Sequence, residues 1–175
     1  MTKLAFLGID PGWSGSVVAI DQERKILGHI ENYKNEEQFY DSWKEFRRTV
    51  LSGFSDSEIL ICIEKVHSNR FWGCKQNFNF GRSIAAVKAV LYTQGLIYSE
   101  VTPQAWQKEL IGPPPKRAKK GIPKQKVKRD TKALAKLIAS KLWPQFDKSN
   151  HTGCVDALLI AEYSLRKYLL DNLLK

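Results

Sequence analysis

Residues 4–21 of the chain read LAFLGIDPGWSGSVVAID. The first seven form an apolar run that ends in Asp10, a pattern that is typical of a buried strand. A proline and two glycines follow and predict a turn, and residues 16–21 then favour a second, β-rich strand. A third strand is predicted at residues 25–31, so we expect the chain to begin as three antiparallel strands.

The rest of the chain alternates helices with strands. Helices are predicted at residues 36–51, 80–93, 103–110, 130–142 and 155–170, and strands at residues 58–64 and 96–101. We find no internal repeat and no second domain, so residues 1–175 are expected to form one domain. Three antiparallel strands followed by β-α-β crossovers predict an α/β protein with a mixed five-stranded sheet and helices on both faces. This is the element order of the RNase H-like fold.

The composition is ordinary for a folded protein, with 43% hydrophobic and 26% charged residues. No apolar run approaches the roughly 18–20 residues of a membrane span, and no secretory signal pattern opens the chain. Three widely spaced cysteines argue against a disulfide framework and against a structural zinc site. A reducing, cytoplasmic setting is therefore expected, with no membrane partner and no small-molecule cofactor. The net charge of +10 suggests a polyanionic partner.

Three acids stand at the ends of these predicted elements. Asp10 ends the first strand, Glu64 ends the fourth, and Asp156 begins the last helix. If the first and fourth strands are parallel neighbours, a helix across their ends can present Asp156 to the other two carboxylates. Such a cluster repels itself unless cations neutralise it, and hard oxygen ligands suit Mg²⁺ or Mn²⁺. Each acid taken alone is more simply a helix cap or a solvated strand end.

Four segments of the chain resemble the RuvC family of Holliday junction resolvases. They are GIDPG at residues 8–12, IEKV at 63–66, VTPQAWQK at 101–108 and VDALLIA at 155–161. The segments occur in the family's order and span nearly the whole chain, although GIDPG alone would be weak, since actin-like ATPases open similarly. The Thr-Pro-x-x-Trp and His-x-Gly-x-x-Asp-Ala patterns are most similar to the phage-encoded branch, which would place the protein in the host cytoplasm.

The resemblance implies a set of catalytic residues. Asp10, Glu64 and Asp156 correspond to catalytic metal ligands, which would bind two Mg²⁺ ions per site, with Mn²⁺ as a substitute. The family usually carries a fourth ligand, Asp or His, one helical turn before the last Asp. That position is Gly153 here, which cannot bind a metal, and His151 is the best replacement, as a ligand or as a base on the attacking water. Asp147 is a second candidate.

Residues 112–129 form a predicted loop that is rich in proline and crowded with lysine and arginine. A basic run is often only a solvated segment. This one lies between predicted helices and follows the strand at residues 96–101, whose end is expected near the acids, so phosphate binding is the preferred interpretation. The candidate DNA-contacting residues here are Lys116, Arg117, Lys119, Lys120, Lys128 and Arg129, and the helix before the loop adds Lys108. The family's DNA-contacting lysines correspond best to Lys128 or Arg129.

Arg70, Phe71 and Trp72 follow Glu64 in a second predicted loop. Two adjacent aromatic residues beside an arginine either pack under the loop, join a dimer interface or bind DNA. The family uses an aromatic residue of this loop as a wedge that stacks on unpaired bases at the branch point. His67 occupies the usual place, so Phe71 and Trp72 are predicted as the wedge from their position in the loop.

The predicted function is that of a homodimeric, metal-dependent endodeoxyribonuclease, a hydrolase that cuts two opposed strands of a four-way DNA junction. Two-fold symmetry suits the junction, and the alanine-rich face of the helix at residues 80–93 is a candidate interface. One alternative is a less selective RNase H-like nuclease on branched DNA. Another is a junction-binding protein with weak or no catalysis. An actin-like ATPase is disfavoured because the chain is too short for a two-domain nucleotide clamp.

Overall fold

A computed structural model describes residues 3–113, 130–146 and 153–174 of the chain. A five-stranded mixed sheet forms its centre, with strand order β3-β2-β1-β4-β5. The strands are β1 (Ala5–Asp10), β2 (Ser16–Asp21), β3 (Ile26–Glu31), β4 (Ile59–Glu64) and β5 (Tyr98–Val101). β1, β2 and β3 pair antiparallel, whereas β4 runs parallel to β1 and β5 runs parallel to β4. The predicted sheet is confirmed.

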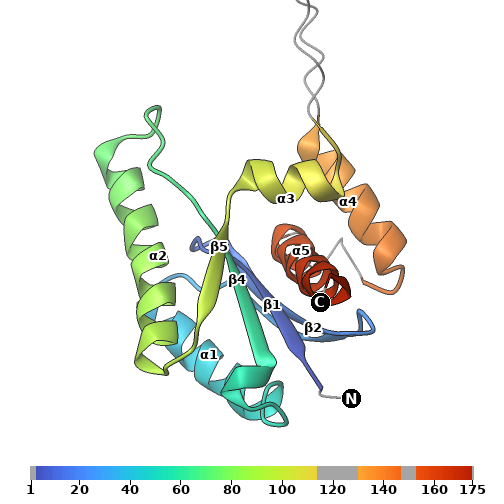
Figure 1. Ribbon diagram of the computed structural model, residues 1–175. Helices are drawn as coiled ribbons and strands as arrows, with labels where there is room; N and C mark the ends of the chain where they lie inside the picture. Colours follow the sequence, from blue (N-terminus) through green and yellow to red (C-terminus); the bar gives the residue numbers. More distant parts are fainter. Residues whose placement is uncertain (1–2, 114–129, 147–152, 175) are drawn as a thin grey trace, which may run out of the picture.

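Helices cover both faces of the sheet, as predicted (Figure 1). They are α1 (Glu36–Thr49), α2 (Cys74–Thr93), α3 (Pro103–Leu110), α4 (Thr131–Leu142) and α5 (Cys154–Leu173), and a single 3₁₀ turn spans Asp56–Glu58. α1 and α2 pack on one face, and α3, α4 and α5 pack on the other. The two faces therefore enclose two separate hydrophobic clusters, with the sheet between them.

The central strand β1 is buried on both faces of the sheet, because its successive side chains enter different hydrophobic clusters. Phe6 packs into the cluster under α3, α4 and α5, whereas Leu7 and Ile9 pack into the cluster under α1 and α2. Successive residues of a strand point to opposite faces, so a strand buried on both sides must be apolar throughout. This is the physical reason for the continuous apolar run of the sequence.

Helix α2 begins at Cys74, six residues before the predicted start at Phe80. Its first turns are polar, and the pattern of small apolar residues that indicates the helix begins only later. The side chain of Asn77 makes the early start favourable, because its amide donates to the backbone oxygens of Asn69 and Trp72 and its Oδ1 accepts from the Asn69 N–H. These bonds join the first turn of α2 to the preceding loop.

Helix α5 lies directly against β1 because of a glycine. A Cβ atom at Gly8 would overlap the carbonyl oxygen of Ala157 and the backbone nitrogen of Ala161. The fully buried Glu162, in the middle of α5, forms an ion pair with Arg24 at 2.9 Å, which joins the helix to the turn between β2 and β3. It forms a second ion pair, at 2.7 Å, with Arg166 of the same helix. The position of α5, and of every side chain at its start, therefore depends on close backbone contact with β1.

We expect Gly8→Ala to destabilise the fold by at least about 1–3 kcal/mol, because the methyl group meets backbone rather than a movable side chain. Urea unfolding followed by circular dichroism would measure the change. Gly53→Ala is the matched control, since a Cβ atom there is 3.9 Å from the nearest atom, Lys3 Nζ. Equal stability of the two variants would contradict the role of Gly8.

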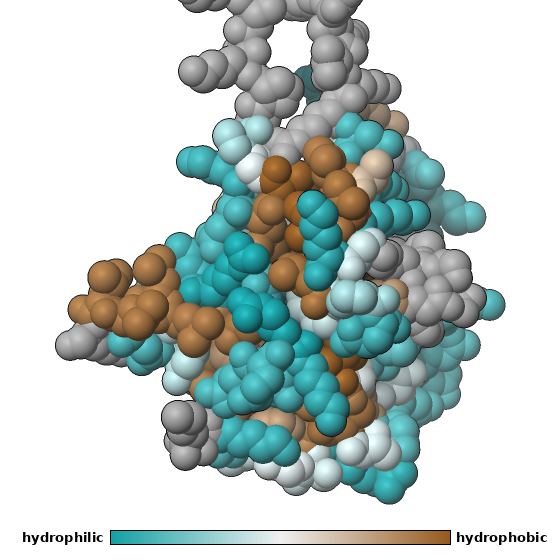
Figure 2. Space-filling view, turned by 90° about the vertical axis from the view of Figure 1, so that its right-hand side faces the viewer, coloured by the Kyte–Doolittle hydropathy of each residue, from teal (hydrophilic) through white to brown (hydrophobic). Residues whose placement is uncertain are grey.

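The opposite end of α5 is apolar and exposed. Leu170, Leu173 and Leu174 are 49%, 82% and 77% exposed, and Figure 2 shows a hydrophobic projection at its left side. Within the described parts of the chain, no helix is both long enough and apolar enough to cross a membrane.

Candidate metal centre

Asp10 and Glu64 lie side by side at one end of the sheet. Asp10 is the last residue of β1 and Glu64 is the last residue of β4. These strands are parallel neighbours in which Ile9 is paired with Ile63, so the two following carboxylates emerge together. This is the arrangement expected from the two acidic strand ends of the sequence.

Asp156 comes to the same place from α5. It is the third residue of that helix, whose backbone approaches β1 at Gly8. The turn before the helix is fixed as well, because the buried Ser16 hydroxyl donates to the Gly153 carbonyl oxygen at 2.9 Å. Ser16 begins β2 opposite Asp10, so the sheet itself positions the start of α5 beside the first acid.

The three carboxylates influence one another electrostatically. Burial, together with the charges of Glu64 and Asp156, raises the pKa of Asp10 to about 7. Burial also raises the pKa of Glu64, to which the charge of Asp156 adds, and burial raises the pKa of Asp156. An acid cluster that resists ionisation in this way is stabilised by a bound cation, so its chemistry fits a divalent metal.

The indole of Trp106 holds Glu64 in position. Its Nε1–H donates to Glu64 Oε1 at 2.8 Å, and this bond counteracts the effect of burial on the pKa of Glu64. Trp106 is buried in α3, a helix that Thr102 caps by accepting from the Ala105 N–H. The sequence contained the signal in its Thr-Pro-x-x-Trp pattern, but Trp106 was not predicted as a site residue.

Trp106→Phe is expected to weaken the binding of a divalent metal at the acids about 10–100-fold while the protein stays folded, because it removes the donor to Glu64 and keeps most of the ring volume. Calorimetric titration with Mn²⁺ would measure the loss. Trp143→Phe is the matched control, since this buried indole donates to the Arg24 carbonyl oxygen instead of to an acid. If both variants lost the same metal affinity, the effect would be general rather than specific to Glu64.

A cavity of about 410 Å³ opens beside the acids. Asp10 and Asp156 line it, together with Lys132 from the first turn of α4. The ammonium group of Lys132 lowers the pKa values of both carboxylates against the effect of burial. Lys132 was not among the predicted site residues, although the basic run of the sequence reaches it. It places a positive charge in the same cavity as the two carboxylates.

The three acids are more widely spaced than the ligands of a single compact metal ion. Within the described residues, the one group of three such side chains whose ligand atoms all lie within 4.8 Å of one another is His29, Glu31 and Cys154. Two-ion sites separate their metals by about 3.5–4 Å, so their carboxylates need a wider spread than a single ion does. The ligand atoms of Asp10, Glu64 and Asp156 do not all lie within 4.8 Å of one another.

The aromatic loop, which contains Arg70, Phe71 and Trp72, lies near this centre. Phe71 is 81% exposed and the guanidinium of Arg70 stacks on its ring at 4.7 Å, whereas the Trp72 ring contacts Phe80 of α2 edge-on. Trp72 and Asp10 both line a second cavity, of about 480 Å³. The loop and the acids thus share one surface, on which Phe71 is the more exposed aromatic side chain and Trp72 contacts α2.

Of the remaining predicted site residues, one lies in the described part of the chain and the others lie outside it. Lys108 is exposed in the last turn of α3. Seven predicted residues and the alternative ligand Asp147 lie outside the described residues; the seven are Lys116, Arg117, Lys119, Lys120, Lys128, Arg129 and His151.

The sheet order, the helices on both faces and the acids at the ends of two parallel strands define an RNase H-like fold with a carboxylate centre. Among solved structures, the chain is similar to T. thermophilus RuvC in complex with a Holliday junction substrate, with a TM-score of 0.56 and 14% identity over 90% of each chain. A second structure of Thermus thermophilus RuvC has a TM-score of 0.56 and 15% identity, covering 90% of this chain and 91% of that one. The sequence matches no family model and no curated protein.

Proposed function

We propose that the chain is a RuvC-type resolvase, a metal-dependent endodeoxyribonuclease that cuts four-way DNA junctions. The observation that carries this proposal is the meeting of Asp10, Glu64 and Asp156 at one end of the sheet, with the pKa of Asp10 raised to about 7. The shared fold with RuvC supports the substrate, since one of the similar structures is a complex with a Holliday junction. Membership of the phage-encoded branch stays a prediction.

Asp10, Glu64 and Asp156 would hold the metal, which we propose to be two Mg²⁺ ions, with Mn²⁺ as a substitute. Carboxylate oxygens are the ligands that these hard cations prefer. The bound ions would supply an activated water and charge stabilisation at the cleaved phosphodiester. The raised pKa values of the acids support this assignment, because cation binding offsets their mutual repulsion.

Other residues orient the ligands and the substrate. Trp106 fixes one oxygen of Glu64, and the ammonium of Lys132 faces the cavity where the phosphate would lie. We propose His151 as the fourth catalytic group, replacing an acid at position 153. A Cβ atom at Gly153 would have only ordinary contact with Ser14 O, at 3.5 Å.

The basic loop and the aromatic loop would bind the arms and the branch point of the DNA, respectively. Arginine and lysine contacts to phosphate give affinity without sequence preference. We assign the wedge to Phe71 rather than to Trp72, because the Phe71 ring is 81% exposed and the Trp72 ring, in contact with Phe80, is 41% exposed.

A homodimer suits the two-fold symmetry of the junction, and α2 is the proposed interface. Ala85 and Ala89 are exposed on this helix, and so are Phe78 (67%) and Tyr92 (83%). Small residues flanked by aromatic ones allow two helices to approach closely and bury apolar area. Such a dimer would place one carboxylate centre on each of two opposed strands.

Cleavage of labelled DNA tests the proposed function. Purified protein should nick opposed strands of a four-way junction in Mg²⁺ at least about tenfold faster than it cuts a Y-fork or plain duplex, because shape selects the substrate. Equal rates on all three substrates would favour a less selective RNase H-like nuclease. Binding to the junction without cleavage in Mg²⁺ or Mn²⁺ would favour a non-enzymatic junction-binding protein.

The lysine and arginine side chains of the basic loop, residues 112–129, are expected to add to DNA affinity through contacts with phosphate groups. Replacing Lys116, Arg117, Lys119 and Lys120 with alanine should reduce the slope of log affinity against log salt by up to about 0.9 per lost phosphate contact. Binding to junction and duplex should weaken alike, while selectivity for the junction changes less. Titrations at several salt concentrations measure the slope. The matched control replaces four exposed lysines of other elements, Lys25, Lys44, Lys141 and Lys167, and an equal slope in both variants would remove the loop from the DNA interface.

A further inference from the structure

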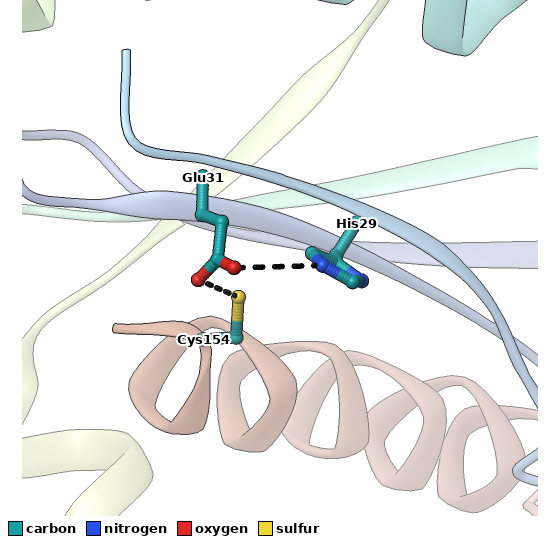
Figure 3. Close-up of side chains that lie close together, drawn as sticks. All are labelled: His29, Glu31 and Cys154. Carbon is teal, nitrogen blue, oxygen red and sulfur yellow. Dashed lines mark hydrogen bonds and ion pairs between the residues drawn. The ribbon is translucent and has the colours of Figure 1, made fainter. Parts of the chain in front are cut away.

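A second group of metal-binding side chains lies between β3 and the start of α5 (Figure 3). His29 and Glu31 come from the same face of β3, and Cys154 is the first residue of α5. The Cys154 Sγ lies 3.3 Å from Glu31 Oε2, and the His29 Nε2 lies 3.7 Å from Glu31 Oε1. One ligand atom from each residue can be chosen so that all three lie within 4.8 Å of one another.

These distances match the spacing of ligands around one tetrahedral ion. Ligand atoms that bind zinc at about 2.0–2.3 Å are separated from one another by about 3.3–3.8 Å. The side chains also point toward a common centre from two elements that are far apart in the sequence (Figure 3). The Cys154 side chain is buried, whereas His29 and Glu31 are 30% and 16% exposed, so an ion has a route from solvent to the thiol.

The types of ligand atom in this group favour zinc over magnesium. A thiolate is a soft ligand that Mg²⁺ does not choose, whereas thiolate, imidazole and carboxylate together are typical of Zn²⁺. Asp10, Glu64 and Asp156 offer only hard oxygen atoms. The two groups therefore differ in chemistry, although Cys154 stands only two residues before Asp156.

We propose that His29, Glu31 and Cys154 form a zinc site, with water or a further residue in the fourth position, that fastens the first turn of α5 to β3. The spacing of the cysteines argues only against a zinc site built from several cysteines, whereas this site combines one cysteine with a histidine and a glutamate. The bound ion would link positions 29–31 to position 154 and so support the helix that presents Asp156. Metal binding at this site does not require the proposed nuclease activity.

Cobalt substitution tests the site without any measurement of cleavage. Metal-free, reduced protein would be titrated with Co²⁺ in the presence of excess Mg²⁺, and thiolate-to-cobalt absorption would be recorded in the near ultraviolet. We expect this band to saturate at one equivalent and to be displaced by Zn²⁺. We also expect Zn²⁺ at about 100 times its Kd to raise the Tm by roughly 5–10 °C. Absence of the band would overturn the proposal.

Four variants locate the ion. Cys154→Ser should abolish the band, and His29→Gln should weaken Co²⁺ binding by at least about 100-fold, since loss of a supporting partner alone costs about 10–100-fold. Cys74→Ser and Asp10→Asn are the controls and should keep the band, because Cys74 is exposed on α2 and Asp10 belongs to the other centre. A band that persists in Cys154→Ser would overturn the proposal. If that variant does not fold, His29→Gln decides, because it keeps the thiol.

Discussion

Asp10→Asn, Glu64→Gln and Asp156→Asn are each expected to abolish cleavage of a four-way junction while junction binding remains. Loss of one ligand charge should lower the single-turnover rate by at least about 1,000-fold, which corresponds to roughly 4 kcal/mol of barrier. Binding should remain because the basic residues and the aromatic loop are unchanged. Removal of an acid also relieves repulsion in the metal-free protein, so affinity for DNA should rise slightly rather than fall.

Gel-shift titration and single-turnover cleavage on the same junction would separate binding from catalysis. Asp41→Asn is the matched control, since it removes the same charge from an exposed position on α1. Wild-type cleavage by one of the three variants would exclude that residue from the metal centre. Loss of both binding and cleavage would show instead that the acid supports the fold.

The metal-free protein should become less stable as the pH rises from 5 to 7. The pKa of Asp10 is about 7 in the folded state against an ordinary value of 3.8, so in this range the folded state binds a proton that the unfolded state has released. Stability from this group is therefore present at low pH and is lost as the pH rises through 7. The loss amounts to about 2 kcal/mol between pH 5 and pH 7, and the raised pKa values of Glu64 and Asp156 act in the same direction.

Urea unfolding at a series of pH values, with and without Mg²⁺, would measure this effect. The contribution of Asp10 is the difference between the wild type and Asp10→Asn, because other titrating groups are common to both proteins. Mg²⁺ should restore stability at pH 7 in the wild type and do so less in the variant. Identical pH profiles for the two proteins would show that Asp10 is not held in a repulsive cluster.

The sequence by itself determined the strands and the two acids at their ends. β1 and β4 are buried on both sides, which requires continuous apolar runs, and such runs are visible without a structure. Short connections and right-handed crossovers leave few ways to order such strands, and one of these makes β1 and β4 parallel neighbours, with Asp10 beside Glu64. The amphipathic pattern of α1 likewise needs only local spacing, with Phe39, Trp43 and Phe46 on its buried side.

The start of α2 was decided by tertiary contacts. Its first turn contains polar residues of no clear period, and the hydrogen bonds of Asn77 to Asn69 and Trp72 favour helix there. Local propensity is worth only tenths of a kcal/mol per residue, so a few such bonds override it.

The tertiary structure also decided which side chains meet in each of the two candidate metal centres. Trp106 reaches Glu64 across 42 positions of sequence, and Cys154 reaches Glu31 across 123. Periodicity reports which face of an element is buried, but it does not report which side chains of separate elements meet. That depends on how closely the elements pack, and here the packing of α5 depends on the missing side chain of Gly8, which lets the helix backbone lie directly on β1 and bring Asp156 and Cys154 to the sheet.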